Sequence, residues 1–198
     1  MKSLVKKIRW VIGASLLVVL TSNSVNANTV EVIVDNEDAE FSVEFGTWDV
    51  ENGIPDAFGG SHRIHGQGLG TERVRFTPDL PVDGTYEVYA RWVSSENRAT
   101  NATYTVTYSG GAALAPTNQQ NPPAPDLTIG IFDFELLGTF DFQAGTSGHV
   151  EVGTAGANGA VSADAVQFTL IPEPSTFALA VLGMLTPLRG GRRRQRGD

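Results

Sequence analysis

The 198-residue chain contains no cysteine and only three histidines, His62, His65 and His149. Without cysteine the chain has no disulfide framework, no thiol nucleophile and no cysteine-ligated zinc or iron–sulfur site. Three histidines are too few for a metal centre rich in imidazole ligands. Charged residues are also scarce, at 18% of the sequence against 41% hydrophobic residues, and this composition is typical of a folded domain rather than a disordered chain.

Positive charge is scarce in the middle of the chain. Residues 28–170 hold five arginines and no lysine against twenty acidic residues, a formal charge of −15, whereas the whole chain has −8. The remaining basic residues gather at the two ends. An acidic body of this kind repels phosphate backbones and has no basic stripe to bind them, so we expect no nucleic-acid partner.

The first 27 residues have the three parts of a secretory signal peptide. Four basic residues precede an apolar stretch from Trp10 to Leu20, and the segment ends in Val25-Asn26-Ala27, with small residues where the cleavage rule needs them. We expect cleavage between Ala27 and Asn28. The apolar stretch is too short to span a bilayer, which disfavours an uncleaved membrane anchor. The segment therefore predicts export from the cytoplasm.

The C-terminal segment combines three features in order. Pro172-Glu173-Pro174 comes first, a short apolar stretch follows, and five arginines lie between residues 189 and 196. The apolar stretch is shorter than the roughly 20 residues of a permanent span, and arginines favour the cytoplasmic side of a membrane. The segment predicts a transient membrane association through a short C-terminal helix. The alternative is an ordinary linker before a weak membrane helix.

This arrangement resembles the PEP-CTERM sorting signal of Gram-negative bacteria. The resemblance implies that an exosortase-type membrane enzyme recognises Pro172, Glu173 and Pro174, cuts nearby and passes the protein to the cell envelope, cell surface or extracellular matrix. The two prolines keep this tripeptide extended, a form that a peptide-binding groove accepts. We therefore divide the chain into a signal peptide (1–27), a body (28–171) and a sorting signal (172–198).

The body shows the two-residue alternation of β-strands and no helical periodicity. Alternation is clearest in residues 71–77, 85–92 and 103–108, and further expected strands cover 30–35, 136–142, 149–152 and 161–170. Polar turns rich in glycine and proline separate these runs. The pattern predicts an all-β fold, an antiparallel jelly-roll-like β-sandwich. The proline-rich stretch 115–126 is expected outside the sheets, with an exposed loop at one end of the sandwich.

Short motifs follow one another along the body in a distinctive order. They include Val34-Asp35-Asn36, Phe58-Gly59-Gly60, Phe76–Pro81, Gly84–Tyr89, Leu137-Gly138-Thr139-Phe140 and Ala163–Phe168. Their order and spacing resemble the golvesin C-terminal-like domain and the related carbohydrate-binding-like domain of xanthan lyases, over roughly residues 32–170. The resemblance implies a jelly-roll-like β-sandwich that serves as an accessory module beside catalytic or surface domains. The sequence departs from the family pattern in the insertion at 122–126 and in Phe134, where the family tends to have tryptophan.

Three aromatic residues are candidates for stacking on sugar rings, Trp48, Tyr89 and Trp92. Flat apolar rings with a polar edge suit the faces of pyranose sugars. Alternation places Tyr89 opposite Tyr86, which favours Tyr89 as an outward contact, whereas Trp92 shares the face of Tyr86 and is expected in the core. For each of the three, core packing is the alternative.

A second candidate contact is the cluster of His62, Arg63 and His65. It lies in the glycine-rich stretch 59–70, which predicts a loop. Imidazole and guanidinium groups on a loop suit a carboxylate or a uronic acid. The alternative is an ordinary polar surface.

Asp164 shares its alternation face with Val166 and Phe168, so its carboxylate must be hydrogen-bonded or bound to an ion. One hypothesis is a structural Ca²⁺ between the first and last strands, with Asp164 and Asp35 or Asp38 as oxygen ligands. The alternative is that Asp164 accepts backbone N–H bonds from a neighbouring turn. We favour this alternative because residues 35–38 lack the spacing of a recognised calcium loop.

No catalytic motif of the GxSxG, HExxH or P-loop type occurs, so we expect no enzyme. The sequence predicts an exported, envelope-sorted, non-catalytic β-sandwich that binds or organises extracellular polysaccharide. Two alternatives stay open. One is a structural matrix or surface protein with protein partners and no glycan ligand. The other is a small glycan-active enzyme, which requires paired acidic side chains facing one groove.

Overall fold

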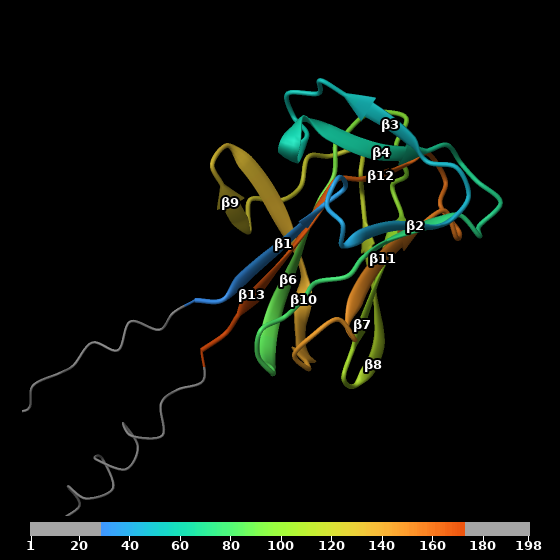
Figure 1. The fold of residues 1–198 in the computed structure, drawn as a ribbon. Helices are drawn as coiled ribbons and strands as arrows, with labels where there is room; N and C mark the ends of the chain where they lie inside the picture. The colour runs from blue at the N-terminus through green and yellow to red at the C-terminus, as the bar shows by residue number, and fades with distance from the viewer. Residues whose placement is uncertain (1–28, 173–198) are drawn as a thin grey trace, which may run out of the picture.

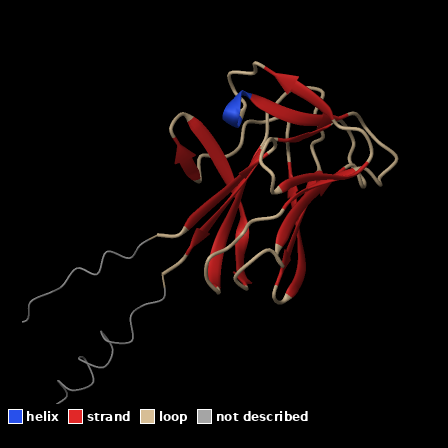
Figure 2. Cartoon of the chain, viewed as in Figure 1, coloured by secondary structure: helices blue, strands red, loops and turns tan. Residues whose placement is uncertain are grey.

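The computed structural model describes residues 29–172, which form thirteen strands and one 3₁₀ turn, η1 (Phe58–Gly60) (Figures 1 and 2). Two five-stranded sheets pack against each other, and a three-stranded sheet lies at one end of them. All pairings between these strands are antiparallel. The antiparallel β-sandwich expected from the alternation is confirmed.

The first sheet has the strand order β1-β13-β6-β10-β9. Its strands are β1 (Glu31–Asp35), β6 (Gly84–Arg91), β9 (Leu127–Ile129), β10 (Phe132–Phe142) and β13 (Ala165–Leu170). Glu31 at the start of β1 lies opposite Thr169 near the end of β13. The chain therefore enters and leaves the sandwich side by side, on the first sheet (Figure 1).

The second sheet has the order β2-β5-β11-β7-β8, and the small sheet has the order β12-β4-β3. The strands of the second sheet are β2 (Phe41–Phe45), β5 (Arg73–Phe76), β7 (Ala102–Tyr108), β8 (Gly111–Thr117) and β11 (His149–Gly153). The strands of the small sheet are β3 (Asp49–Asn52), β4 (Ser61–His65) and β12 (Val161–Ala163).

Alternate residues of the central strands fill the space between the two large sheets. Tyr86 and Val88 of β6, and Tyr104 and Val106 of β7, are at most 1% exposed and belong to one core cluster. Burying a large apolar side chain contributes about 1.5–3 kcal/mol, so this shared layer holds the sheets together. The threonines that alternate with them on β7 are left to form the outer face of the second sheet.

Two segments expected as loops are strands. Residues 61–65 of the glycine-rich stretch form β4, which pairs with β3 and β12. Residues 115–117 end β8, which pairs only with β7 among the strands described. The exclusion of Pro116 from a sheet was therefore wrong: β8 is an edge strand, where a missing N–H is tolerated. The loop that follows is partly exposed as expected, but Gln119 and Pro123 are buried in it.

The signal peptide, Glu173 and Pro174 of the sorting motif, and the short C-terminal helix lie outside the described residues. Pro172 is the last described residue, and it is exposed. Within residues 29–172 the structure contains no helix with the length and apolar character needed to cross a bilayer.

Candidate ligand-binding site

Tyr89 points away from the main core, as the alternation predicts, but only 7% of it is exposed. It packs with Phe134 and Ala165, and apolar residues of the hairpin formed by β9 and β10 pack against this second cluster. Its hydroxyl donates to Glu87 Oε2 at 2.7 Å, and burial raises the pKa of Tyr89 to about 12. The prediction of an outward sugar contact is therefore wrong, because the hairpin covers this part of the first sheet.

The two tryptophans also pack inside the protein. Trp92 is fully buried, as expected, and its Nε1 donates to the carbonyl of Asn121 at 2.9 Å. Trp48 is 4% exposed, and its ring lies against His65 with centroids 5.4 Å apart. Neither ring presents a face to a ligand, so their candidacy as glycan contacts fails in favour of core packing.

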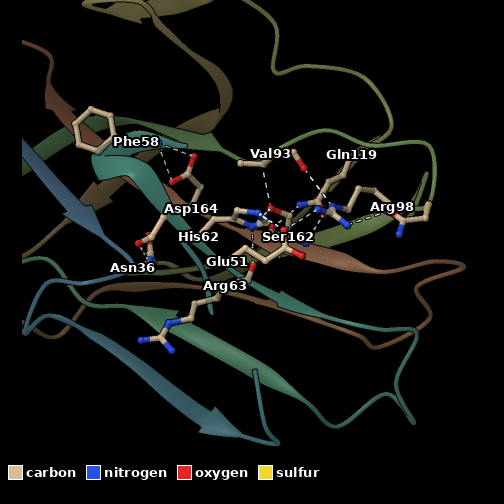
Figure 3. A network of polar contacts seen from close by, with 12 residues as sticks. Asn36, Glu51, Phe58, His62, Arg63, Val93, Arg98, Gln119, Ser162 and Asp164 are labelled. Carbon is tan, nitrogen blue, oxygen red and sulfur yellow. Dashed lines mark hydrogen bonds and ion pairs between the residues drawn. The ribbon is translucent and has the colours of Figure 1, made fainter. Parts of the chain in front are cut away.

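His62 is fully buried on β4, between Ser162 and Glu51 (Figure 3). Its Nδ1 lies 3.1 Å from Ser162 Oγ, and its Nε2 lies 2.9 Å from Glu51 Oε2. Burial lowers the pKa of His62, although the nearby Glu51 opposes the shift. A buried imidazole that two neighbours already occupy cannot grip a uronic acid, so this prediction for His62 is wrong.

Arg63 is the neighbour of His62 on β4, and it is partly exposed. Its guanidinium carbon lies 5.7 Å from the centre of the Phe41 ring, close enough for a cation–π contact. The structure therefore separates the two residues: His62 points into the polar network, and Arg63 points away from it (Figure 3).

Gln119 belongs to the same network, and sequence reasoning missed it. Its Nε2 donates to the carbonyl of Ser162 at 2.8 Å, and its Oε1 accepts from the N–H of Ser162 at 2.8 Å. The side-chain amide thus satisfies the backbone of β12 as a neighbouring strand would. No local pattern marks this residue, since it lies in the polar run Asn118-Gln119-Gln120-Asn121 of a proline-rich loop.

Asp164 lies between β12 and β13 and has no exposed surface. Both carboxylate oxygens accept from the N–H of Phe58 at 3.1 Å, which confirms the prediction of backbone bonds from a neighbouring turn. Arg91 Nε lies 3.1 Å from Asp164 Oδ2. This N–H has no partner in hydrogen-bond geometry, so the contact is an ion pair by distance alone. Burial raises the pKa of Asp164 to about 8, against the opposing effects of Phe58 and Arg91.

Asp35, Asp38 and Asp164 do not form a group of three metal-ligating side chains, although, after burial, the charge of Asp35 contributes to the raised pKa of Asp164. Asp38 Oδ2 accepts from the N–H of Asp35 at 2.8 Å and so closes its own turn. Burial raises the pKa of Asp35 to about 6. Across residues 29–172, no group of three or more histidine and acidic side chains is placed to hold a metal ion. This arrangement does not support the calcium hypothesis.

The outer face of the second sheet carries an open cleft of about 290 Å³. Strands β5, β11, β7 and β8 form its floor, and the segments before β5 and after β11 form its rim. Its lining residues are Gly70, Thr71, Glu72, Arg73, Thr103, Thr105, Leu114, Glu151, Gly153 and Ala155. Alternation along residues 71–77 puts Arg73 and Arg75 on the face opposite Val74 and Phe76, but it contains no sign of a hollow there.

Strand register explains how these residues meet. One row across the five strands consists of Ser42, Arg75, Glu151, Thr105 and Leu114, each directly opposite the next. Directly opposite residues of antiparallel strands project from the same face, about 4.5–5.5 Å apart at Cβ. Residues from four separate segments of the sequence thus form one continuous surface.

The next row contains the hollow. It consists of Phe45, Arg73, Gly153, Thr103 and Pro116. Gly153 lies between Arg73 and Thr103 in this row and contributes only backbone to the lining of the cleft. A Cβ at position 153 would lie 2.6 Å from the carbonyl oxygen of Glu72, so the backbone itself excludes a larger residue here.

The cleft also has an apolar part. Leu114 is 71% exposed on its floor, and Phe45 is 55% exposed in the adjoining row. A shift in register within β2, between Val43 and Phe45, places Phe45 opposite Arg73 and so on the outer face. Sequence reasoning missed Phe45, because alternation from Phe41 would assign it to the core. In such an arrangement the threonine hydroxyls can hydrogen-bond the hydroxyls of a sugar, while the neighbouring apolar side chains contact its C–H face.

Charges in the cleft are paired with one another. Arg75 donates to Glu151 Oε1 through Nη2 at 2.8 Å and Nε at 3.1 Å, and its Nη2 lies 3.2 Å from Glu44 Oε2. Arg73 Nε lies 3.4 Å from the same oxygen of Glu151. Glu72 Oε2 accepts from Thr154 Oγ1 at 2.5 Å and from two backbone N–H groups, and the Thr154 bond is the main reason that its pKa falls to about 2.

The antiparallel sandwich and the open polar cleft on one sheet face define a β-sandwich module with a ligand-accessible surface. The chain belongs to the Golvesin C-terminal domain family, which matches residues 32–170. The identification agrees with the family resemblance seen in the sequence.

The chain is similar to a small part of two much longer xanthan lyases. The xanthan lyase of Bacillus sp. (strain GL1) is 32% identical over 145 residues, which are 71% of this chain and 15% of that protein. The structure of Paenibacillus xanthan lyase is 41% identical with a TM-score of 0.63, over 72% of this chain and 13% of that chain. A more distant likeness is to CBM35 from Cellvibrio japonicus Abf62, 14% identical with a TM-score of 0.48, over 70% of this chain and 92% of that one. The chain thus spans about one seventh of the xanthan lyases that it matches.

Proposed function

We propose that this protein is a non-catalytic module that binds extracellular polysaccharide in the cleft on the outer face of the second sheet. The observation that carries the proposal is the cleft itself, where Thr103 and Thr105 lie beside the exposed Leu114. Kinship with xanthan lyases, enzymes named for a polysaccharide, supports a carbohydrate ligand.

The state of the cleft carboxylates supports a binding role over catalysis. Glu151 is paired with two arginines, and Glu72 accepts three hydrogen bonds that lower its pKa to about 2. A general acid needs a proton near neutral pH, and a nucleophilic or basic carboxylate needs an oxygen directed at substrate. The lowered pKa of Glu72 does not suit a general acid, and neighbouring donors hold the oxygens of both carboxylates that they contact, which supports a binding role.

We further propose that the protein is exported by residues 1–27 and sorted by residues 172–198. An exosortase-type enzyme would act at Pro172-Glu173-Pro174 and deliver the module to the envelope, surface or matrix of a Gram-negative-type bacterium. The position of the chain end supports this arrangement. The C-terminal strand β13 belongs to the first sheet, whereas the cleft lies on the outer face of the second sheet, so a tether at this end leaves the cleft open.

A pair of matched variants of the full chain tests polysaccharide binding. Leu114 in the cleft and Ile131 at the tip of the β9–β10 hairpin are both exposed aliphatic residues, at 71% and 83%. Leu114→Ala is expected to weaken binding in affinity electrophoresis at least fivefold, because it removes the apolar floor of the cleft. Ile131→Ala should leave binding unchanged. Equal affinities for the two variants, or no retardation by any polysaccharide in the wild type, would contradict the proposed function.

A further inference from the structure

We infer that the cleft selects neutral polysaccharides and excludes polyanionic ones; this inference rests on the proposed function. The argument starts from the supply of positive charge. The five arginines of residues 29–172 are the only lysine or arginine side chains in that range. Arg91 and Arg98 are 2% and 5% exposed, and Arg63 lies on β4 of the small sheet with its guanidinium over the Phe41 ring. None of these three lines the cleft. Among these arginines, a carboxylate-bearing sugar in the cleft has only Arg73, which lines it, and Arg75, which lies beside it on β5 opposite Glu151, to bind.

Both of these arginines are already engaged. Arg75 holds Glu151 and Glu44 at 2.8 and 3.2 Å. Arg73 lies 3.4 Å from Glu151 Oε1, and its Nη1 donates to the carbonyl of Thr71 at 3.4 Å. The Glu151 side chain is only 19% exposed. To bind an arginine here, a ligand carboxylate would have to displace Glu151. The ion pair formed with the ligand would then replace an ion pair lost within the protein, so little binding energy would be gained.

Longer-range electrostatics act in the same direction. The cleft and its border hold three glutamates, Glu44, Glu72 and Glu151, against two arginines, inside a body of formal charge −15. A polyanion approaching this face meets a potential of its own sign. The neighbouring His149 adds no positive charge near neutral pH, since burial and Arg75 lower its pKa.

A neutral glycan meets none of these barriers. The Thr105 hydroxyl can donate and accept, the Thr103 hydroxyl, which donates to the carbonyl of Asn101 at 3.4 Å, can still accept, and the exposed Leu114 offers an apolar surface. These contacts are dipolar and apolar, so added salt does not screen them appreciably. Neutral selection thus has a distinct signature, which is binding that is independent of ionic strength.

The test measures binding of the full chain to two groups of polysaccharides at 20 and 300 mM NaCl. Dextran, laminarin and glucomannan are the neutral probes, and polygalacturonate and alginate are the anionic ones. We expect saturable binding to at least one neutral probe, with less than a twofold change in Kd between the two salt concentrations. Saturable binding to an anionic probe that weakens more than tenfold at 300 mM NaCl would overturn the inference.

Two variants identify the cause of the selection. Arg63→Gln, which removes one charge outside the cleft, should change Kd for the bound neutral probe less than threefold. Glu151→Gln frees two guanidinium groups and should raise affinity for polygalacturonate at 20 mM NaCl at least fivefold. No such gain would refute the role assigned to charge pairing, provided that circular dichroism shows both variants to be folded.

The outcomes also separate this inference from the proposed function. Binding to anionic probes alone overturns the neutral selection and leaves polysaccharide binding intact. No binding to any of the five probes removes both.

Discussion

The sharpest test of how this fold is held together is the substitution Gln119→Leu. Gln119 is fully buried, and its amide makes two hydrogen bonds of 2.8 Å to the backbone of Ser162. Leucine fills a similar volume, so the substitution opens no large cavity. It does remove the partner of the Ser162 N–H and carbonyl, which lie on the side of β12 that faces away from β4. The perturbation is therefore almost purely a loss of buried hydrogen bonds.

The expected loss follows from those two bonds. A buried backbone donor or acceptor left without a partner costs about 1–3 kcal/mol, so leaving both groups of Ser162 unsatisfied costs about 2–6 kcal/mol. Domains of this kind are stable by only about 5–15 kcal/mol in total. A loss near 3 kcal/mol, at about 2 kcal/mol per M of urea, lowers the unfolding midpoint by about 1.5 M.

Urea unfolding followed by tryptophan fluorescence measures this shift. Trp92 is a suitable reporter because it is buried and its Nε1 donates to the carbonyl of Asn121, in the same loop as Gln119. Gln120→Leu is the matched control. Its amide also makes two bonds, to the carbonyls of Glu96 and Arg98, but the residue is exposed and water can replace them. The control should cost about 0.5 kcal/mol, in the range of ordinary surface substitutions.

Gln119→Glu tests the same contact in a second way. A protonated carboxyl can donate to the Ser162 carbonyl and accept from its N–H, whereas a carboxylate can only accept. The variant should therefore lose more stability at pH 7 than at pH 4. If Gln119→Leu costs no more than Gln120→Leu, the amide of Gln119 does not act as a substitute strand and the reasoning is refuted.

Three further predictions concern the buried side chains of Asp164 and Tyr89 and the backbone at Gly153. The pKa of Asp164 is raised to about 8 in the fold, so its contribution to stability is full below pH 4 and is lost as the pH rises toward 8. Asp164→Asn should remove this dependence. Between pH 5 and 7 the free energy of unfolding, measured by urea titration, should fall by about 1.4 kcal/mol per pH unit more in the wild type than in the variant. Parallel pH profiles of the two proteins would count against the raised pKa. Tyr89→Ala should destabilise by about 3–5 kcal/mol in urea unfolding, as expected for a packed aromatic residue; an unchanged midpoint would restore its candidacy as a surface contact. Gly153→Ala brings a Cβ within 2.6 Å of the Glu72 carbonyl oxygen. We therefore expect the free energy of unfolding to fall by about 1–3 kcal/mol and polysaccharide binding to weaken. A variant with wild-type stability and affinity would contradict this close approach.

Much of the fold could be predicted because its central strands carry a clean alternation. β6 alternates Tyr86 and Val88 with Glu87 and Tyr89, and the structure buries the first pair between the sheets. The strands that escaped prediction lack this signal for physical reasons. β3 is exposed along its whole length, so burial imposed no pattern on it. β8 contains Pro116, which only an edge position permits.

The candidate site was less accessible to sequence reasoning. Alternation showed that Tyr89 leaves the main core, but not that a hairpin from residues 127–142 folds over it. The reverse holds for Phe45, which an irregularity in β2 moves to the outer face beside Arg73. In both cases the deciding contact joins residues far apart in the chain, and a local pattern contains no information about it.

The amino-acid sequence by itself determined the class of fold, the family and the outward direction of Arg73 and Arg75, because strand periodicity and motif order are local properties. Only the tertiary structure decided which surfaces stay open. The register of the antiparallel strands β11, β7 and β8 brought Glu151, Thr105 and Leu114 into one row, and the cleft lies over this row and the next one, which contains Gly153. Packing of distant segments likewise buried His62, Tyr89 and Trp48, since exposure depends on what folds over a residue rather than on the residue itself.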